Sequence, residues 1–291
     1  MLDQLQDRLC RNISAEELAA YDADGVAVLR NVVNARWLEA MSRAIDGVLS
    51  DPGELSVEYT PKEKSGRYYI EYFMWRRHPD FRAFVKDSPM PELAARILRS
   101  KEVNLFYDQL FVKETSTEEA TPWHQDLSYW PLAGNDILSI WIPFDRVTRD
   151  TGGVVYIKGS HRWGKMYRPV GFSPGSEFDR MYKTVDLEDL PDIDAGSHAY
   201  EMMHWDLFPG DVIIHHPLTV HCASGNRSST VRRRALALRY LGNDARYDDR
   251  PGTFLRNANF RSRLPPIALN DGDRVAGELF PRVWPPASDG A

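Results

Sequence analysis

A histidine and an aspartate two positions apart, His124 and Asp126, are the residues of this sequence best suited to do chemistry. On a β-strand, side chains two positions apart leave the same face, so an imidazole and a carboxylate would converge as two ligands of one metal ion. A distant histidine would complete a set of two nitrogens and one oxygen on one face of an octahedron, which is typical of non-haem Fe(II) sites. The pair alone is a weak signal, and its interpretation depends on whether the rest of the chain supplies that histidine.

The third ligand should come from a strand or strand end that is remote in the sequence, because a barrel brings such strands together. Among the eight histidines, His221 fits best, since it follows the apolar segment 212–214 and precedes a turn-rich segment. His215 and His216 are the alternatives. Because neighbouring residues on a strand face opposite ways, at most one of those two can point inward.

A run of three arginines, 232–234, leads into an apolar strand, and alternation along that strand decides which arginine matters. One face carries Arg233, Ala235, Ala237 and Arg239, and the other carries Arg232, Arg234, Leu236 and Leu238. We expect the leucine face to pack under helices and the alanine face to line a cavity. A buried guanidinium needs a carboxylate partner, because its paired N–H donors match the two oxygens of a carboxylate. Since no protein acid is obviously placed to serve, Arg233 is our candidate for binding a dicarboxylate ligand.

The elements that would position these residues change character along the chain. Helices are predicted from a capping box at residues 14–17 to about 25, over 37–48, and over about 79–99 with an interruption near two prolines. Residues 51–66 are polar and loop-like. Strands are predicted at 26–29, 105–112, 137–144, 154–158, 212–216 and 231–241. Helices followed by strands favour a mainly β fold in which helices cover one side of a double-sheet core.

We expect the whole chain, 1–291, to form a single domain. Its parts would be a mainly helical stretch over about 1–100, a β core over about 102–245 and a C-terminal extension over about 246–291. Within the core, residues 164–203 include an acidic run and form a long insertion. Long loops in compact domains are usually functional lids or disordered, so this insertion is a candidate lid, with a solvated surface excursion as the alternative.

Composition limits the class of protein. The chain is 43% hydrophobic and 27% charged, which is ordinary for a globular protein. A net charge of −6 argues against binding to duplex nucleic acid. No apolar run approaches the roughly 18 residues that span a bilayer, the first residues lack a signal-peptide pattern, and two cysteines are too few for a disulfide framework. We therefore expect a cytoplasmic protein with no nucleic-acid or membrane partner.

Three blocks of residues together resemble the phytanoyl-CoA dioxygenase family of Fe(II)/2-oxoglutarate-dependent oxygenases. The first is His124-Gln-Asp126 followed by Leu-Ser-Tyr-Trp-Pro, and the second is a Gly-Gly pair at 152–153 leading into Lys-Gly-Ser-His-Arg-Trp-Gly at 158–164. The third is Pro-Gly-Asp at 209–211, then His221, Asn226, Ser228 and an arginine shortly before Ala235. These blocks run in the family's order across roughly residues 20–245.

The resemblance implies a double-stranded β-helix core, also called a jelly roll or cupin-like fold, in which His124, Asp126 and His221 bind iron. It implies 2-oxoglutarate as co-substrate and dioxygen as oxidant. Arg233 would pair with the distal carboxylate of 2-oxoglutarate. Further residues of the co-substrate pocket would be Trp141, Gln109 and Tyr107.

The resemblance also implies a hydroxylase, because halogenating relatives lose the carboxylate that this chain retains as Asp126. In such a reaction, 2-oxoglutarate is decarboxylated to succinate while an unactivated C–H bond of a small metabolite is hydroxylated. Ala223 departs from the serine that some members direct toward 2-oxoglutarate. A zinc hydrolase with a similar ligand set is one alternative function, although it leaves the Arg233 face unexplained. A non-catalytic, metabolite-binding jelly roll with structural histidines is another.

Candidate contacts to the prime substrate are Arg67, Tyr69 and Arg239. Two arginines near one pocket indicate an anionic substrate. For the group at 67–71, the alternative is an ordinary strand or loop edge.

Overall fold

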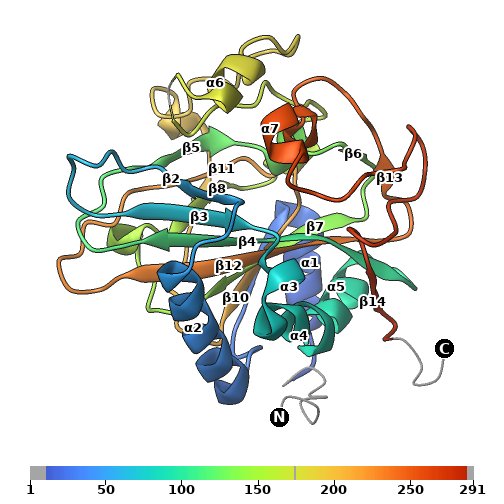
Figure 1. The fold of residues 1–291 in the computed structure, drawn as a ribbon, viewed down its shortest axis with the longest axis horizontal. Coiled ribbons are helices and arrows are strands. Elements are labelled where there is room, and N and C mark those ends of the chain that lie inside the picture. Colours follow the sequence, from blue (N-terminus) through green and yellow to red (C-terminus); the bar gives the residue numbers. More distant parts are fainter. Residues whose placement is uncertain (1–10, 174, 287–291) are drawn as a thin grey trace.

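The computed structural model describes residues 11–173 and 175–286, and its core consists of two antiparallel β-sheets packed against each other (Figure 1). Among these residues, the larger sheet has eight strands: β1 (Val26–Leu29), β10 (Val212–His215), β7 (Ile137–Pro143), β12 (Arg233–Leu241), β4 (Val103–Lys113), β3 (Tyr68–Tyr72) and β2 (Ser56–Glu58) in that order, with β14 (Arg282–Trp284) paired to β4. The smaller sheet contains β5 (Thr121–His124), β11 (His221–Ala223), β8 (Val154–Ile157) and β9 (Met202–Met203). A separate ladder pairs β6 (Leu132–Ala133) with β13 (Arg246–Tyr247). The core is a double-stranded β-helix, as predicted.

Helices cover the outer face of the larger sheet (Figure 1). They are α1 (Ala15–Asp24), α2 (Ala35–Ser50), α3 (Met74–Arg77), α4 (Pro79–Asp87) and α5 (Met90–Leu98). Two short helices, α6 (Glu177–Tyr182) and α7 (Ala258–Arg261), lie on the opposite side of the molecule from α2 and α4. Short 3-10 turns span Asp126–Tyr129, Arg149–Thr151, Ser160–Arg162, Ser197–Ala199 and Phe254–Arg256. No described helix is both long and apolar enough to cross a membrane.

Local sequence explains where the long helices begin and end. The hydroxyl of Ser14 accepts a hydrogen bond from the backbone of Glu17, and the Glu17 carboxylate accepts one from the backbone of Ser14, which is a complete capping box. Gly25 ends α1 in the left-handed region, at φ 75°. In α2, the residues at helical spacing from Trp37 to Val48 are buried. The three predicted helices are confirmed, and the third divides into α4 and α5 at Ser88 and Pro89, with Pro91 in the first turn of α5.

One prediction for the first hundred residues is wrong. Residues 51–66 were expected to form a loop, but β2 lies within them and pairs with β3, so that Val57 stands opposite Ile70. β3 pairs in turn with β4, and the hairpin therefore extends the larger sheet. A strand of three residues is too short for its alternation to be recognised in a polar segment.

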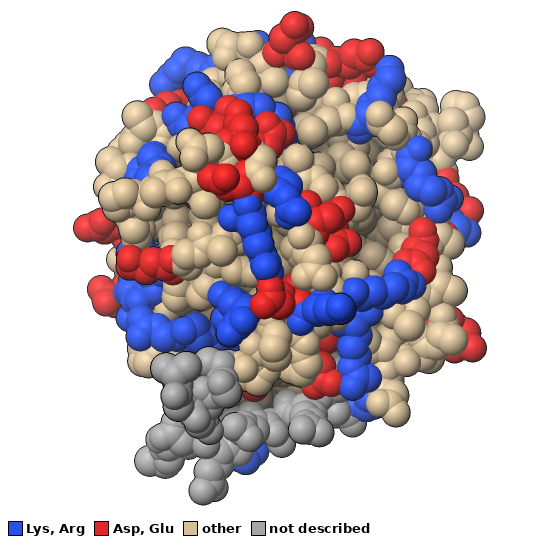
Figure 2. Space-filling model, turned by 90° about the vertical axis from the view of Figure 1, so that its right-hand side faces the viewer, with Lys and Arg blue, Asp and Glu red and all other residues tan. Residues whose placement is uncertain are grey.

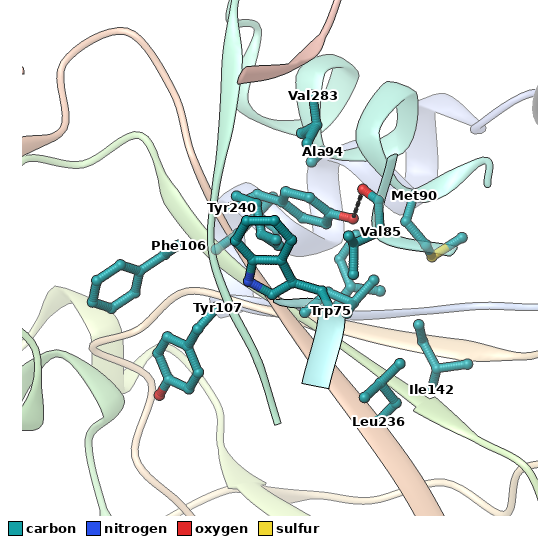
Figure 3. Close-up of a cluster of buried hydrophobic side chains, with 14 of the residues drawn as sticks. Trp75, Val85, Met90, Ala94, Phe106, Tyr107, Ile142, Leu236, Tyr240 and Val283 are labelled. Atoms are coloured by element: carbon teal, nitrogen blue, oxygen red, sulfur yellow. Dashed lines mark hydrogen bonds between the residues drawn. The ribbon is translucent and has the colours of Figure 1, made fainter. Parts of the chain in front are cut away.

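β12 divides its side chains between two layers, as alternation predicts. Leu236, Leu238 and Tyr240 belong to the core cluster that also contains residues of α2, α4 and α5. Tyr240 donates a hydrogen bond to the carbonyl of Val85 in α4, over 3.3 Å (Figure 3). On the other face, Ala235 and Ala237 pack with residues of both sheets. Because these side chains are small, they leave space for a cavity between the two sheets.

The C-terminal extension is part of the same structure. β14 pairs with the start of β4, and the backbone N–H of Leu105 donates to the carbonyl of Pro281 over 2.9 Å. Phe254 and Phe260, from the same extension, line the cavity between the sheets. The strands beyond 245 escape a prediction based on patterning, because they are short and separated by proline- and glycine-rich turns.

Acidic and basic side chains are interspersed over the face shown in Figure 2. Where lysine and arginine side chains gather on this face, aspartate and glutamate side chains lie between them.

Asp108, on the helix-covered face of β4, is a carboxyl group removed from water. One of its oxygens accepts a hydrogen bond from the backbone of Trp75 over 3.0 Å, and the other has no partner among the described residues. Burial raises the pKa of Asp108 to about 8. The folded protein therefore keeps a proton on this group between about pH 4 and 8, where the unfolded chain has lost it.

The first prediction concerns the variant Asp108→Asn, which cannot ionise. Because the folded wild type must retain a proton that the unfolded chain releases, Asp108 contributes less stability as the pH rises toward 8. The free energy of unfolding of the variant should therefore rise relative to wild type by about 1.4 kcal/mol per pH unit between about pH 5 and 7. Urea denaturation at several pH values measures this difference. A difference that does not change with pH would contradict the assignment.

Candidate metal centre

Three buried side chains converge at the facing ends of β5 and β11. These strands are antiparallel and place His124 directly opposite His221, with ring centroids 4.2 Å apart. The Oδ1 atom of Asp126 lies 3.6 Å from Nε2 of His124 and 3.8 Å from Nε2 of His221. One ligand atom from each residue lies within 4.8 Å of the other two, so a single metal ion could contact all three. The structure thus brings together the three residues that the sequence singled out.

The expectation that His124 and Asp126 share a strand is wrong. β5 ends at His124, and Asp126 begins a 3-10 turn. Gln125 between them is extended, at φ −113° and ψ 133°, and so the flanking side chains still leave the same side of the chain. The Gln125 side chain fixes this turn, because it donates to the carbonyl of Leu218 over 3.0 Å and accepts from the backbone of Tyr167 over 3.0 Å.

Backbone carbonyls determine which nitrogen of each histidine faces the centre. Nδ1 of His124 lies 2.8 Å from the carbonyl of Pro122, and Nδ1 of His221 lies 2.9 Å from the carbonyl of Thr219. A carbonyl can only accept, so each Nδ1 carries the hydrogen and each Nε2 presents a lone pair. Two lone pairs and a carboxylate oxygen therefore point toward one another. A cation is the group that satisfies such a set, and two nitrogens with one oxygen suit iron(II).

The second oxygen of Asp126 is held by two donors. Oδ2 accepts hydrogen bonds from Oγ of Ser139 over 3.0 Å and from Nε2 of His215 over 3.2 Å. Burial would raise the pKa of Asp126, but the hydrogen bond that His215 donates is among the interactions that outweigh burial and hold the pKa well below its ordinary range. The carboxylate is therefore ionised and ready to bind a cation. Burial also lowers the pKa of His221, which keeps this imidazole neutral, as a metal ligand must be.

His215 and His216, the two alternative candidates for the third ligand, point in different directions. His215 points inward, behind Asp126, and its Nδ1 lies 3.2 Å from the hydroxyl of Tyr156. Its neighbour His216 faces the ring of His161. The prediction that at most one of this pair points inward is confirmed. Sequence reasoning considered His215 as a ligand and missed its role as the donor that orients Asp126.

A cavity of about 290 Å³ opens beside the three residues, between the two sheets. Aromatic side chains from the sheets, the insertion and the C-terminal extension form much of its wall. The predicted residues that line it, besides the three that converge, are Tyr107, Gln109, Trp141, Arg233 and Arg239. The cavity is at the small end of the range for sites that enclose small molecules.

Arg233 presents a buried guanidinium that forms no ion pair within residues 11–173 and 175–286. The residue is 2% exposed, and Nη1 donates to the carbonyl of Phe111 over 3.2 Å. Its Nε lacks a hydrogen-bond partner in the part of the chain that the structure describes. The guanidinium carbon lies 5.9 Å from the ring centre of Trp141. Burial lowers the pKa of Arg233 to about 10, so the group stays charged at neutral pH and can bind an anion.

Lys113 is a buried residue of this region that sequence reasoning missed. It stands directly opposite Arg233 in the pairing of β4 with β12, and its Nζ donates to the carbonyl of Ser224 over 2.7 Å. Burial is the main cause that lowers the pKa of Lys113 well below its ordinary value, and the positive charge of Arg233 is the second cause. Its position at the end of an apolar strand gave the sequence no signal of burial.

Two predicted substrate contacts lie outside the cavity. β3 turns Tyr68 and Tyr72 toward it, so Tyr69 between them points to the opposite face, where its hydroxyl donates to Glu71. Arg67 lies over the ring of Tyr69 and pairs with Glu58 over 2.6 Å. The expectation that Arg67 and Tyr69 contact a substrate here is therefore corrected by the direction of their side chains.

The insertion at 164–203 contributes part of the cavity wall. Its described residues include Phe172, whose ring centre lies 5.1 Å from that of His124. The hydroxyl of Tyr129 donates to the carbonyl of Val170 over 2.9 Å and thereby ties the insertion to the 3-10 turn that starts at Asp126. Side chains of α6 also line the cavity, so this segment lies over the site.

Comparison with known proteins places this chain among enzymes with the same type of core. The family model for phytanoyl-CoA dioxygenase matches residues 21–235. The ectoine dioxygenase of Sphingopyxis alaskensis is 24% identical over 233 residues, which are 77% of this chain and 74% of the relative. A probable alpha-ketoglutarate-dependent hypophosphite dioxygenase of Stutzerimonas stutzeri is 32% identical over 123 residues, 42% of this chain and 40% of the relative.

A solved structure extends the similarity to the whole fold. The non-haem alpha-ketoglutarate-dependent carbocyclase SnoK from nogalamycin biosynthesis superposes with a TM-score of 0.72 at 25% identity. The superposition covers 94% of this chain and 98% of that one.

The second prediction tests the support of Asp126. His215→Phe removes one of the two donors to Oδ2, and the carboxylate should then lose its fixed orientation. We expect the affinity for Fe(II) to fall by about 10- to 100-fold. Anaerobic Fe(II) titration followed by tryptophan fluorescence measures it. His215→Gln, which retains a donor, should recover part of the loss, and the exposed His198→Phe should bind as wild type. Unchanged affinity in His215→Phe would show that Asp126 needs no such support.

Proposed function

The chain belongs to the phytanoyl-CoA dioxygenase family of Fe(II)/2-oxoglutarate-dependent dioxygenases, and on this basis we propose that it hydroxylates an unactivated C–H bond of a small-molecule metabolite. The observation that carries the proposal is the combination of His124, Asp126 and His221 with an unpaired Arg233 on the wall of one cavity. A metal site explains the first group, and a dicarboxylate co-substrate explains the second.

His124 and His221 would bind iron through Nε2, and Asp126 through Oδ1. All three atoms are already directed to one point by hydrogen bonds on their far sides. Such preorganisation keeps the cost of assembling the site low. When bound, iron(II) with 2-oxoglutarate activates dioxygen and supplies the oxidant for the C–H bond, with succinate and carbon dioxide as co-products.

Arg233 would bind the distal carboxylate of 2-oxoglutarate. A buried guanidinium without an acid partner is costly, and a two-oxygen partner matches its fork. Trp141 beside it provides a flat wall for the carbon chain of the co-substrate. Gln109 and Ala237 occupy opposite positions on β4 and β12, and both line the cavity between the arginine and the metal residues.

Aromatic side chains would exclude water from the reacting centre. The rings of Tyr129 and Phe172 both meet the ring of His124 edge-on, at centroid distances of 5.7 and 5.1 Å. A dry, closed wall of this kind keeps a reactive oxidant directed at the bound substrate. It also positions that substrate, because a molecule that fills the cavity has few orientations available.

A hydrolytic function is less well supported. A zinc hydrolase would need a general base beside the metal-bound water. Among the described residues that line the cavity, the acids are Asp126 and Glu58, and Glu58 is paired with Arg67. His215 is held between Asp126 and Tyr156 and is not available as a base.

The third prediction separates Arg233 from its neighbours. Anaerobic wild-type protein with Fe(II) and 2-oxoglutarate should show the visible metal-to-ligand absorption band of a chelated 2-oxo acid. Arg233→Gln should raise the 2-oxoglutarate concentration needed for half of this band by at least about 30-fold, because a buried charge pair is lost. Arg232→Gln is the matched control, since Arg232 points to the other face and forms an ion pair with Glu114.

The band should vanish in Asp126→Ala, which lacks the carboxylate ligand. Succinate release under air, measured in parallel, should follow the band in all variants. A well-folded wild type without the band, or a band that survives Asp126→Ala together with Arg233→Gln, would contradict the proposed function.

A further inference from the structure

We propose that Arg239 binds the acid group of the prime substrate, and that this substrate is a small monoanionic acid with an apolar body. The inference rests on the proposed function, because it concerns the molecule that the metal centre oxidises. It starts from a second buried arginine in the cavity, which neither the metal centre nor the co-substrate site uses.

Arg239 lies on the cavity face of β12, six residues beyond Arg233, which corresponds to a rise of roughly 20 Å along the strand. It stands opposite Ser139, the residue that donates to Asp126. The two arginines therefore occupy opposite ends of the cavity face. A co-substrate of five carbons that reaches from the metal centre to Arg233 leaves Arg239 to another ligand.

The guanidinium of Arg239 is buried and only partly hydrogen-bonded. The residue is 4% exposed, and Nη1 donates to the carbonyl of Ala237 over 3.1 Å. Its Nε finds no partner, and no ion pair forms with it, among the residues that the structure describes. The rings of Tyr107 and Trp130 flank it, with centres 4.9 and 5.9 Å from the guanidinium carbon. Aromatic contacts offset part of the cost of burying a cation, but they leave most of its hydrogen-bonding capacity unused.

When iron(II) and 2-oxoglutarate are bound, no negative charge on these ligands or on the described residues of the cavity is left to balance the positive charge of Arg239. Iron(II), the Asp126 carboxylate and dianionic 2-oxoglutarate together carry one negative charge, which Arg233 neutralises, and the buried Lys113 opposite Arg233 does not line the cavity. Glu58, another acid on the cavity wall, is already paired with Arg67. The positive charge of Arg239 therefore remains, in a place where water is largely excluded. One further negative charge, brought by the substrate, balances it.

A continuous row of aromatic rings joins the metal residues to Arg239. From His124 the row passes through Tyr129, Tyr182, Phe178, Phe260 and Phe254 to Tyr107, with successive ring centres 5.1 to 6.1 Å apart. This wall suits an apolar body whose acid group lies at Arg239. The cavity of about 290 Å³ must also hold the co-substrate, so that body is small. The coenzyme A thioester of a monocarboxylic acid has no free acid on its acyl group, and that acyl group would leave Arg239 unpaired.

The test compares acids with their own primary amides, which have nearly the same shape and no charge. Cyclohexanecarboxylate, 3-phenylpropanoate and decanoate, each with its amide, are titrated calorimetrically into anaerobic protein loaded with Fe(II) and 2-oxoglutarate. In wild type, at least one acid should bind about 10-fold or more tightly than its amide, as expected for a buried charge pair. In Arg239→Gln this preference should fall below about 3-fold, while the absorption band with 2-oxoglutarate is retained.

Two further variants keep the test decisive. Arg239→Lys, which keeps the charge, should retain a measurable preference for the acid, and Arg232→Gln should behave as wild type. Equal binding of every acid and its amide by wild type would overturn the proposal. So would an Arg239→Gln variant that loses 2-oxoglutarate as strongly as Arg233→Gln does, because Arg239 would then belong to the co-substrate site. Absence of the absorption band from wild type itself would instead contradict the proposed function.

Discussion

Asp126 is a carboxylate that is 6% exposed, and removing such an ion from water costs several kcal/mol unless its neighbours compensate. Ser139 and His215 compensate one oxygen with hydrogen bonds. The other oxygen faces the lone pairs of two imidazoles, which cannot donate to it while their hydrogens are bound to backbone carbonyls. A metal cation completes the arrangement. The Asp126 carboxylate is held in this place by three features: the pairing of β5 with β11, the extended backbone of Gln125 and the inward direction of His215.

The second constraint is the charge of the cavity. β12 presents Arg233 and Arg239 to the space between the sheets and turns its leucines toward the helices. Neither guanidinium has an acid partner among the described residues, so β12 contributes two buried cations that the described side chains do not neutralise. Such sites cost stability, and proteins retain them where a ligand supplies the missing charge. Two anions, a dicarboxylate co-substrate and an acidic substrate, account for both.

Much of the site followed from alternation in the sequence, and the rest depended on contacts that spacing does not encode. The position of His221 after an apolar strand and the inward face of Arg233 were predictable, because a two-residue period fixes direction within one strand. The role of His215 could not be predicted, because its contact with Asp126 depends on how two segments distant in the sequence pack together. The prediction for Tyr69 failed because the face of β3 that borders the cavity is set by its pairing with β4.

The most direct test of this account is the position of iron in the protein. Crystals grown or soaked anaerobically with Fe(II) and 2-oxoglutarate, measured at the iron absorption edge, would locate the metal by its anomalous signal. The account predicts one strong peak bound by Nε2 of His124, Nε2 of His221 and Oδ1 of Asp126, with the far carboxylate of 2-oxoglutarate on Arg233. Iron bound by His215 in place of one of these residues, or that carboxylate on Arg239, would contradict it.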